Sequence, residues 1–225
     1  MKRLLNKTLL LTFLFCLAAI NVQSDEVQKR LYLPRGSVDT QKLIGPPPDV
    51  GSEEYQKQIF TVLWLQQTRT PSQVAFVREK LNFKRYEPIL GDSIEKVNIK
   101  VLRDVMASII SEVRDDYDGL KAEYDYPRPF VADDAVKPAT SARPVGSYPS
   151  GHAVRGVVYA RILGEIFPDK KEQLMQLGLQ IGYGRAVAGV HYPMDIVAGQ
   201  KLGNAYSDVI IAGPLFKEKL DTISR

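Results

Sequence analysis

The sequence has few of the side chains that most often bind transition metals. Its 225 residues include one cysteine, Cys16, and two histidines, His152 and His191. No paired-ligand spacing for zinc is present, so we expect no metal and no cofactor. Cys16 also falls in a segment that we expect to be removed. The mature chain then has no cysteine, cannot form disulfides and must rely on its hydrophobic core.

Long apolar runs are scarce, and the one that stands out lies near the N-terminus. Residues 8–20 are apolar and follow a basic start made by Lys2, Arg3 and Lys7. This layout is typical of a secretory signal peptide, and the run is too short to span a bilayer comfortably. We expect residues 1–24 to be a signal peptide cleaved after Ser24. An uncleaved membrane anchor is the alternative.

Charge of one sign is also lacking once this segment is set aside. Three of the 30 Lys and Arg residues and none of the 26 acids lie in residues 1–24, so the formal net charge falls from +4 to +1. Nucleic-acid binding would need a concentrated basic stripe, so we expect no nucleic-acid partner. No mature segment reaches 18 continuous apolar residues, so we expect no stable membrane insertion after cleavage.

Alternating strand patterns are scarce, and helical patterns dominate. Ser52 and Thr70-Pro71 are helix start signals, and apolar residues recur at helical spacing further on. We expect an all-α, single-domain helical bundle over residues 51–225, after an extended proline-rich arm over residues 25–50. The main helices are expected from residue 52, from residue 71, and over 94–118, 151–167, 170–188 and 193–211.

A long polar loop is predicted before the fourth main helix, over residues 119–149. It contains five prolines. An irregular stretch of this length is uncommon inside a compact domain and usually has a function. We therefore expect it to border the active site.

Chemically active residues gather in three clusters, 121–129, 146–152 and 185–195. Ser150 and Gly151 open a predicted helix, where unpaired backbone N–H groups and the positive end of the helix dipole favour an anion. Three cations suited to phosphate oxygens belong to the clusters: Lys121, Arg128 and Arg185. Together these features predict a phosphate site.

The two histidines lie in the second and third clusters. Asp195 follows His191 by four residues and can reach back to its ring, which fixes the tautomer and leaves the other nitrogen as a nucleophile. His152 then remains to protonate the leaving oxygen. A structural hydrogen bond between His191 and Asp195, without catalysis, is the alternative reading of this pair.

The three clusters resemble the signature of the type 2 phosphatidic acid phosphatase superfamily, which has the vanadium haloperoxidase-like fold. More narrowly, the chain is similar to class A bacterial non-specific acid phosphatases, with Gly-Ser-Tyr-Pro-Ser-Gly-His in the middle cluster. The resemblance implies a periplasmic enzyme that hydrolyses small phosphorylated substrates of broad range, without a metal, through a phosphohistidine intermediate. Relatives of this class often self-associate, so the resemblance allows a homo-oligomer, but the sequence does not determine the oligomeric state.

The resemblance also implies a role for each site residue. His191 resembles the nucleophile, Asp195 its orienting carboxylate and His152 the general acid. The residues that resemble the phosphate-binding set are Lys121, Arg128, Ser150, Gly151 and Arg185. One departure concerns the third cluster, which usually opens with Ser-Arg but here reads Gly184-Arg185. We expect the lost hydroxyl to weaken local positioning without abolishing catalysis.

Three other functions use the same residues and stay open at this point. A lipid phosphatase or diphosphatase shares the catalytic set, and a vanadate-dependent haloperoxidase holds vanadate in the same pocket. A periplasmic anion-binding protein would keep the pocket without turnover. The sequence does not specify the leaving group.

Overall fold

The computed structural model describes residues 30–144 and 146–224, and the expected signal peptide lies outside them. Within these ranges the chain forms helices and no strand, which confirms the all-α, single-domain prediction. The helices are α1 (Thr40–Ile44), α2 (Glu53–Thr68), α3 (Pro71–Arg78), η1 (Phe83–Arg85), α4 (Glu87–Leu90), η2 (Gly91–Lys96), α5 (Ile99–Tyr124), α6 (Pro129–Ala132), α7 (Gly151–Ile166), η3 (Pro168–Lys170), α8 (Lys171–Val187), α9 (Pro193–Ala212) and α10 (Pro214–Ile223).

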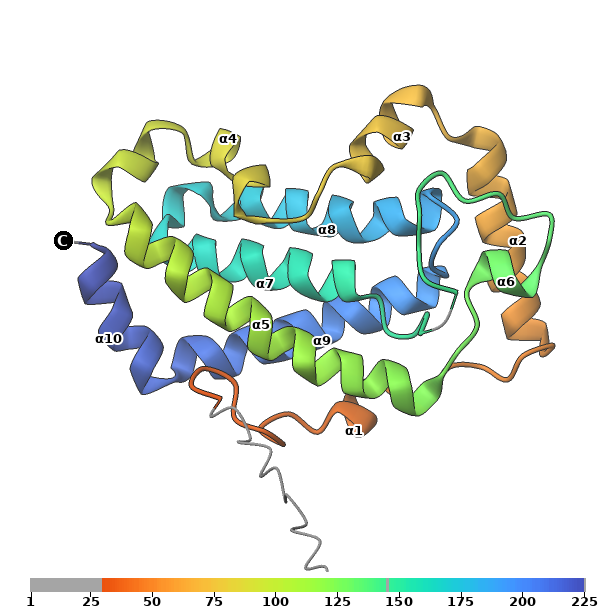
Figure 1. Ribbon diagram of the computed structural model, residues 1–225, viewed down its shortest axis with the longest axis horizontal. Helices are drawn as coiled ribbons and strands as arrows, with labels where there is room; N and C mark the ends of the chain where they lie inside the picture. The colour runs from red at the N-terminus through yellow and green to blue at the C-terminus, as the bar shows by residue number, and fades with distance from the viewer. Residues whose placement is uncertain (1–29, 145, 225) are drawn as a thin grey trace, which may run out of the picture.

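Helices α7, α8 and α9 form the centre of the bundle (Figure 1). Small residues let their backbones approach closely. A Cβ atom at Gly156 of α7 would lie 2.5 Å from the carbonyl oxygen of Gly178 on α8. A Cβ atom at Gly199 of α9 would lie 2.6 Å from the carbonyl oxygen of Ser150, at the start of α7. These contacts place the starts of α7 and α9 side by side, which positions the second and third sequence clusters.

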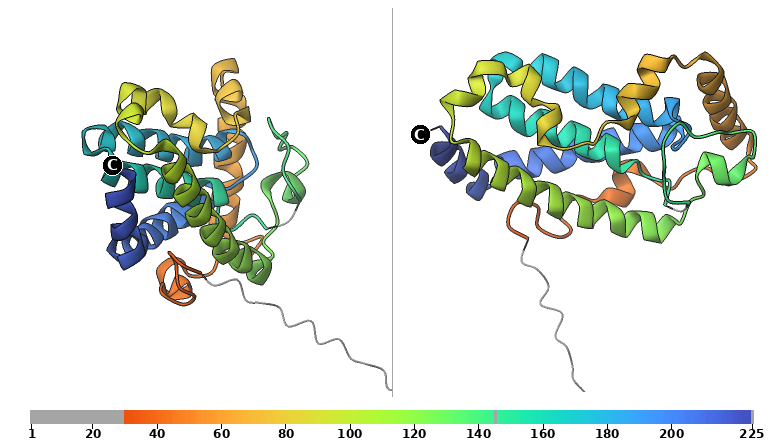
Figure 2. Two further views of the ribbon diagram at one scale, coloured as in Figure 1. Left: turned by 60° about the vertical axis from the view of Figure 1, so that its left-hand side comes forward. Right: turned by 45° about the horizontal axis from the view of Figure 1, so that its top comes forward.

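Helix α5 packs across α7 and is the longest helix of the described chain (Figures 1 and 2). Its predicted bounds, 94–118, are wrong at both ends. Asn98 caps the start by accepting a hydrogen bond from the backbone N–H of Val101. The helix ends at Asp125, which has a left-handed backbone with φ of 40°, just before Pro127. Lys121 therefore lies in the last turn of α5, not in a loop.

The other main helices begin and end close to their predicted bounds. Ser52 caps α2 by accepting a hydrogen bond from the N–H of Tyr55. Thr70 and Gln73 form a capping box at α3. Helices α7, α8 and α9 start at or within one residue of the predicted positions.

Some irregular segments were predicted wrongly. The predicted loop 119–149 includes the end of α5 and the short helix α6, and the predicted extended arm includes α1. Helix α10 was not predicted, because Gly213-Pro214 is typical of the end of a helix. Proline is also favourable at the first position of a helix, and α10 begins there. The N–H of Asn98 donates to the carbonyl of Ile223, 2.8 Å away, which ties α10 to the start of α5.

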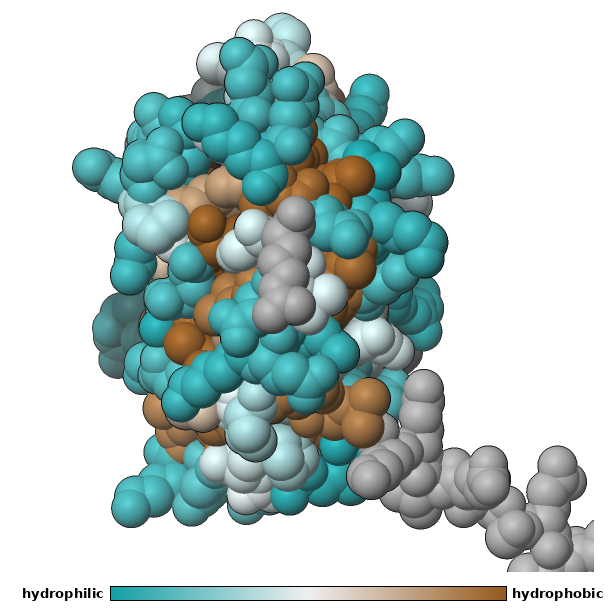
Figure 3. Space-filling view, turned by 90° about the vertical axis from the view of Figure 1, so that its left-hand side faces the viewer, coloured by the Kyte–Doolittle hydropathy of each residue, from teal (hydrophilic) through white to brown (hydrophobic). Residues whose placement is uncertain are grey.

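The end of the molecule that carries α10 has a mixed surface. Hydrophilic side chains cover much of this face, and hydrophobic side chains are visible between them (Figure 3). Of the large apolar residues of α10, Phe216 and Ile223 are buried, and Leu215 and Leu220 are partly buried against the core. Within the described ranges, no helix is long and apolar enough to cross a membrane.

Candidate active site

All eight predicted site residues come together at one cavity of about 640 Å³, although they are spread over 75 positions of the sequence. The cavity lies between the C-terminal half of α5, the start of α7 and the end of α8. Six of the predicted residues line it: Lys121, Arg128, Gly151, His152, Arg185 and His191. Ser150 and Asp195 are fully buried, one residue before Gly151 and one helical turn after His191.

The deepest part of the cavity, here termed the inner wall, consists of Arg128, Arg185 and His191, with Asp195 and Ser147 directly behind. The three lining side chains are only 9, 7 and 3% exposed, and the two behind are fully buried. Polar groups that are buried this deeply need internal partners. The inner wall is therefore held by hydrogen bonds, which fix its geometry.

His191 and Asp195 form a hydrogen-bonded pair, with His191 Nδ1 2.8 Å from Asp195 Oδ2. Burial, followed by the charges of Lys121 and Arg128, lowers the pKa of His191 well below its ordinary value. A neutral ring with its proton on Nδ1 donates to the carboxylate, which leaves a lone pair on Nε2. This lone pair accepts a hydrogen bond from Nη1 of Arg128, 3.0 Å away.

Asp195 is itself positioned by other groups. Its Oδ2 also accepts hydrogen bonds from Ser147 Oγ at 2.6 Å and from the N–H of Tyr192 at 3.0 Å. Burial raises the pKa of Asp195, and these two hydrogen bonds oppose the rise because they favour the carboxylate. Ser147 belongs to the second cluster but was not among the predicted site residues. A second serine three positions before Ser150 was the available signal.

Backbone carbonyls orient the three predicted phosphate-binding cations. Arg128 donates from Nη1 to Val190 O at 2.7 Å and from Nη2 to Gly146 O at 3.3 Å. Lys121 Nζ donates to the carbonyls of Gly146 and Ser147. Burial lowers the pKa of all three cations, and that of Arg185 to about 10. Partly desolvated positive charges favour a nearby anion, so the cluster suits a phosphate group.

His152 lies in the first turn of α7, between the inner wall and the mouth of the cavity. Ser150 caps this helix by accepting from the N–H of Ala153 at 3.4 Å. Gly151 packs under the ring of Tyr117, where a Cβ atom would lie 2.6 Å from Cε2. Burial, and then the charges of Arg185 and Arg155, lower the pKa of His152 to about 2. Its imidazole is therefore neutral among these cations.

The mouth of the cavity, here termed the outer wall, carries further charges that were not predicted: Arg114, Asp118, Arg143 and Arg155. Arg155 is half-buried and the other three are exposed. Arg155 Nε donates to Gly151 O at 3.2 Å. With the inner wall and Lys121, the cavity is lined by six cations against two carboxylates, those of Asp118 and Asp125. The spacing of Arg114, Asp118 and Lys121 on one helix could have identified α5 as a cavity wall.

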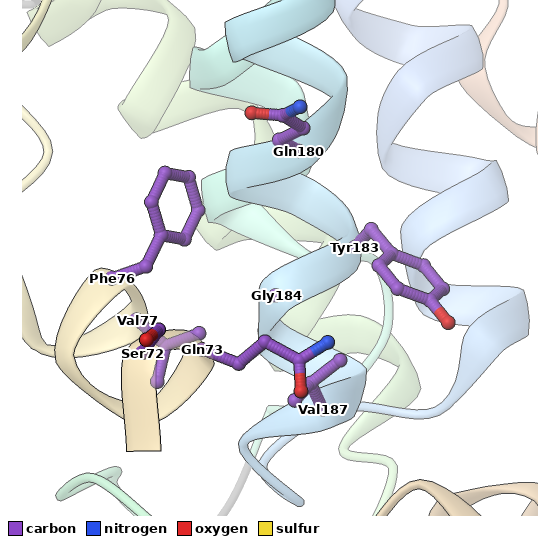
Figure 4. A pocket seen from close by; sticks show the side chains of 8 residues that line it. All are labelled: Ser72, Gln73, Phe76, Val77, Gln180, Tyr183, Gly184 and Val187. Carbon is purple, nitrogen blue, oxygen red and sulfur yellow. The ribbon is translucent and has the colours of Figure 1, made fainter. Parts of the chain in front are cut away.

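Gly184, which replaces the usual serine, faces α3 rather than open space (Figure 4). A Cβ atom at this position would lie 2.8 Å from Cγ1 of Val77, and the ring of Phe76 lies 3.7 Å away. A separate cavity of about 340 Å³ is lined by these residues and Tyr183. Arg185 Nη1 donates to the carbonyl of Val77 at 3.3 Å, so α3 helps to hold this guanidinium.

Comparisons with known proteins agree on the family of the fold. The PAP2 superfamily matches residues 104–213. A non-specific acid phosphatase of Salmonella typhimurium is 24% identical over 95% of this chain and 90% of that protein. A non-specific acid phosphatase of Providencia stuartii is 26% identical over 90% of this chain and 88% of that protein.

A solved structure has a similar fold. It is the crystal structure of a transmembrane PAP2-type phosphatidylglycerolphosphate phosphatase from Bacillus subtilis, which is 18% identical. The match covers 76% of this chain and 89% of that chain, with a TM-score of 0.55.

In the described ranges, no three His, Cys, Asp or Glu side chains gather in a way that could hold a metal ion.

Proposed function

Because this chain belongs to the PAP2 superfamily, we propose that it is a phosphoric monoester hydrolase, an acid phosphatase of broad specificity that acts after export to the periplasm. The observation that carries the proposal is the buried His191–Asp195 pair, in which Asp195 holds Nδ1 and leaves Nε2 directed at the cations of the cavity, 3.0 Å from Arg128 Nη1. Two relatives that span most of the chain are named non-specific acid phosphatases. The expected signal peptide supports export.

The first chemical step uses both histidines. The lone pair on His191 Nε2 forms a bond to phosphorus, while the bond from phosphorus to the ester oxygen breaks. His152 gives its proton to that oxygen, and the alcohol leaves. Asp195 stabilises the positive charge that develops on the His191 ring, because its Oδ2 accepts a hydrogen bond from Nδ1 at 2.8 Å. The product is a phosphohistidine at His191.

The second step returns the enzyme to its starting state. His152, now neutral, accepts a proton from water as the water oxygen bonds to phosphorus. The bond between phosphorus and Nε2 breaks, and inorganic phosphate leaves. Lys121, Arg128, Arg185 and the N–H groups at the start of α7 stabilise the phosphoryl oxygens in both steps. These groups supply fixed positive charge, so we propose that no metal is required.

Substrate binding also prepares His152 as an acid. Burial and the arginines around it lower its pKa to about 2. A phosphate dianion beside the ring adds negative charge to a cavity in which cations dominate. This opposes the effect of the arginines and raises the pKa of His152. Protonation of the general acid is therefore coupled to occupation of the phosphate site.

The test is release of phosphate from 4-nitrophenyl phosphate in the presence of a chelator. We expect turnover by the wild-type protein and a fall in kcat of at least about 1,000-fold in His191→Ala, because the nucleophile is lost. Circular dichroism would establish that the variant is folded. The proposal fails if wild type is inactive from mildly acidic to neutral pH, or if His191→Ala keeps most of its activity.

A second measurement addresses the intermediate. Mass spectrometry of enzyme quenched during turnover, without acid, should find a phosphoryl group on His191. His152 is the only other histidine in the sequence, so it is the internal control. A phosphoryl group on neither residue, despite rapid turnover, would contradict the phosphohistidine mechanism. Binding of phosphate without any turnover would instead support a non-catalytic anion-binding protein.

A further inference from the structure

We propose that the cavity contains a second anionic subsite, formed by Arg114 and Arg155, which selects phosphomonoesters that carry another phosphate or carboxylate group. The inference rests on the proposed function, because it assumes that the scissile phosphate binds at the inner wall. It adds a substrate class to an activity that would otherwise have broad specificity. Neither arginine belongs to the three sequence clusters.

The first observation is the position of Arg114 on α5. Arg114, Asp118 and Lys121 are spaced by four and three residues, so they share one face of the helix, and all three line the cavity. Seven residues separate Arg114 from Lys121, which is about 10 Å along the helix axis. A group bound by Arg114 is therefore several atoms away from a phosphate bound by Lys121.

The second observation is that Arg155 reaches the same region from α7. It lies three residues after His152, on the same side of the helix, and its Nε donates to Gly151 O at 3.2 Å. Arg155 and Arg114 both favour the ionised forms of Tyr117 and Tyr159, opposing the rise in pKa that burial causes there. Arg114, Arg155 and Tyr117 all line the cavity, although the two arginines belong to different helices.

The third observation is the positive charge that a phosphate bound at the inner wall would leave without a counter-charge. The cavity is lined by six cations and two carboxylates. A phosphomonoester dianion at the inner wall would still leave positive charge in excess. Among the described residues, neither Arg114 nor Arg155 forms an ion pair with a carboxylate. Guanidinium groups bind phosphate and carboxylate groups in a forked geometry, which suits them to a second anion.

Tyr117 separates the two subsites. Its ring covers Gly151, at the start of α7, and it lines the cavity between the phosphate cations and the two outer arginines. The part of the substrate that joins its two anionic groups would pass along this ring. A compact diphosphate, in which the two phosphorus atoms share one oxygen, is too short for this path. A sugar that carries phosphates at opposite ends has a suitable length.

The experiment compares fructose 1,6-bisphosphate with fructose 6-phosphate, and uses 4-nitrophenyl phosphate as a substrate with one anionic group. For wild type we expect KM for the bisphosphate to be about tenfold lower than for the monophosphate. In the double variant Arg114→Gln/Arg155→Gln, the ratio of KM for the bisphosphate to KM for 4-nitrophenyl phosphate should rise about tenfold. The ratio is the readout because any effect of Arg155 on His152 applies to both substrates. The ionic strength is kept constant, because long-range attraction depends on salt.

Arg161→Gln is the matched control. It removes one positive charge from α7 outside the cavity, where Arg161 pairs with Asp208 at the surface, and it should change no KM value. Arg114→Gln alone is a second check, because this exposed side chain can be replaced without disturbing the core.

Equal KM values for the two fructose phosphates in wild type would overturn the subsite while leaving the phosphatase assignment intact. If the double variant raised KM for all three substrates equally, the two arginines would act only by long-range attraction of anions, and the subsite would be overturned too. Lack of turnover of all three substrates by wild type would instead contradict the proposed function.

Discussion

The two walls of one cavity differ in how the protein holds them. In the inner wall, Ser147 and the N–H of Tyr192 hold Asp195, Asp195 holds His191, and Val190 O holds Arg128. In the outer wall, Arg114 and Arg143 are exposed, and no carboxylate of the described chain pairs with them. Fixed groups suit bond breaking, whereas exposed charges suit recognition of the part of the substrate beyond the scissile phosphate.

The two walls also differ in how much free energy their ionised side chains cost. Burial raises the pKa of Asp195 and lowers that of His191, so each ionised form is less stable inside the inner wall than in water. The outer wall is solvated and incurs little of this cost. Substitutions in the inner wall should therefore affect catalysis strongly, and those in the outer wall should affect substrate choice.

After loss of the nucleophile itself, Asp195→Asn should produce the largest effect. Its amide oxygen can still accept from His191 Nδ1, so the tautomer is kept, but the negative charge that stabilises phosphorylated His191 is lost. We expect kcat on 4-nitrophenyl phosphate to fall by about 100-fold and KM to change much less. Steady-state kinetics with a chelator measures both. A fall in kcat of less than about threefold would mean that the charge of Asp195 is not needed.

Two controls sharpen this result. The carboxylate has a raised pKa, so its ionisation lowers folded-state stability as pH rises from its ordinary pKa towards the raised one. Asp195→Asn should therefore melt no lower than wild type at neutral pH, which separates lost activity from unfolding. Ser147→Ala removes only one of the hydrogen bonds to Oδ2 and should lower kcat by about tenfold, as expected for a positioning residue.

His152 lies between the two walls, so its protonation shows whether both walls act on one group. Its pKa is lowered to about 2 by burial, Arg185 and Arg155. A bound dianion should raise that pKa, so below the raised value binding takes up a proton and tightens as the pH falls further, down to the pKa of the free enzyme. Sulfate suits the measurement, since it stays a dianion over this range. Its Kd, measured by calorimetry, should decrease by up to about tenfold for each unit that the pH falls.

His152→Gln is the matched control for this prediction. Glutamine keeps a polar side chain but cannot titrate, so its sulfate affinity should depend much less on pH. The remaining dependence reports the other titrating groups of the site, which are Lys121, whose pKa burial lowers to about 7, and Asp195. The same pH dependence in both proteins would show that His152 does not gain a proton when the anion binds.

The sequence predicted the inner wall much better than the outer wall, for a physical reason. The residues of the inner wall belong to fixed patterns, such as the four-residue spacing from His191 to Asp195 and the helix start at Ser150. The outer wall depends on how α5 lies across α7, and the predicted end of α5 at residue 118 placed Lys121 in a loop. Because the predicted helix stopped before Lys121, Arg114 had no predicted relation to the site.

Ser147 and Gly184 show a second limit of sequence reasoning. The function of Ser147 depends on a contact with Asp195, 48 residues away, which no local pattern encodes. The glycine at 184 was interpreted as a lost hydroxyl, but its structural surroundings add another reason. Helix α3 occupies the space where a side chain would lie, and the carbonyl of Val77 accepts a hydrogen bond from Arg185.

Restoring serine at position 184 should produce the smallest effect, and the space around Gly184 determines its direction. In Gly184→Ser, a Cβ atom would meet Val77 Cγ1 at 2.8 Å (Figure 4), so α3 or the Val77 side chain must move. Overpacking costs about 1–3 kcal/mol, and the better helix propensity of serine offsets about 0.5 kcal/mol. We expect a Tm lower by a few degrees and kcat/KM unchanged or reduced by up to about threefold.

The double variant Gly184→Ser/Val77→Ala identifies the cause. Val77→Ala alone leaves a small cavity and should destabilise the protein. In the double variant the smaller side chain at position 77 makes room for the serine. Its loss in free energy of unfolding should therefore be smaller than the sum of the losses in the two single variants. Thermal unfolding of the four proteins measures this coupling. If Gly184→Ser instead raised kcat/KM several-fold with an unchanged Tm, the hydroxyl would matter more than the packing of α3. The inner wall would then lack a hydrogen bond that the carbonyl of Val77 does not replace.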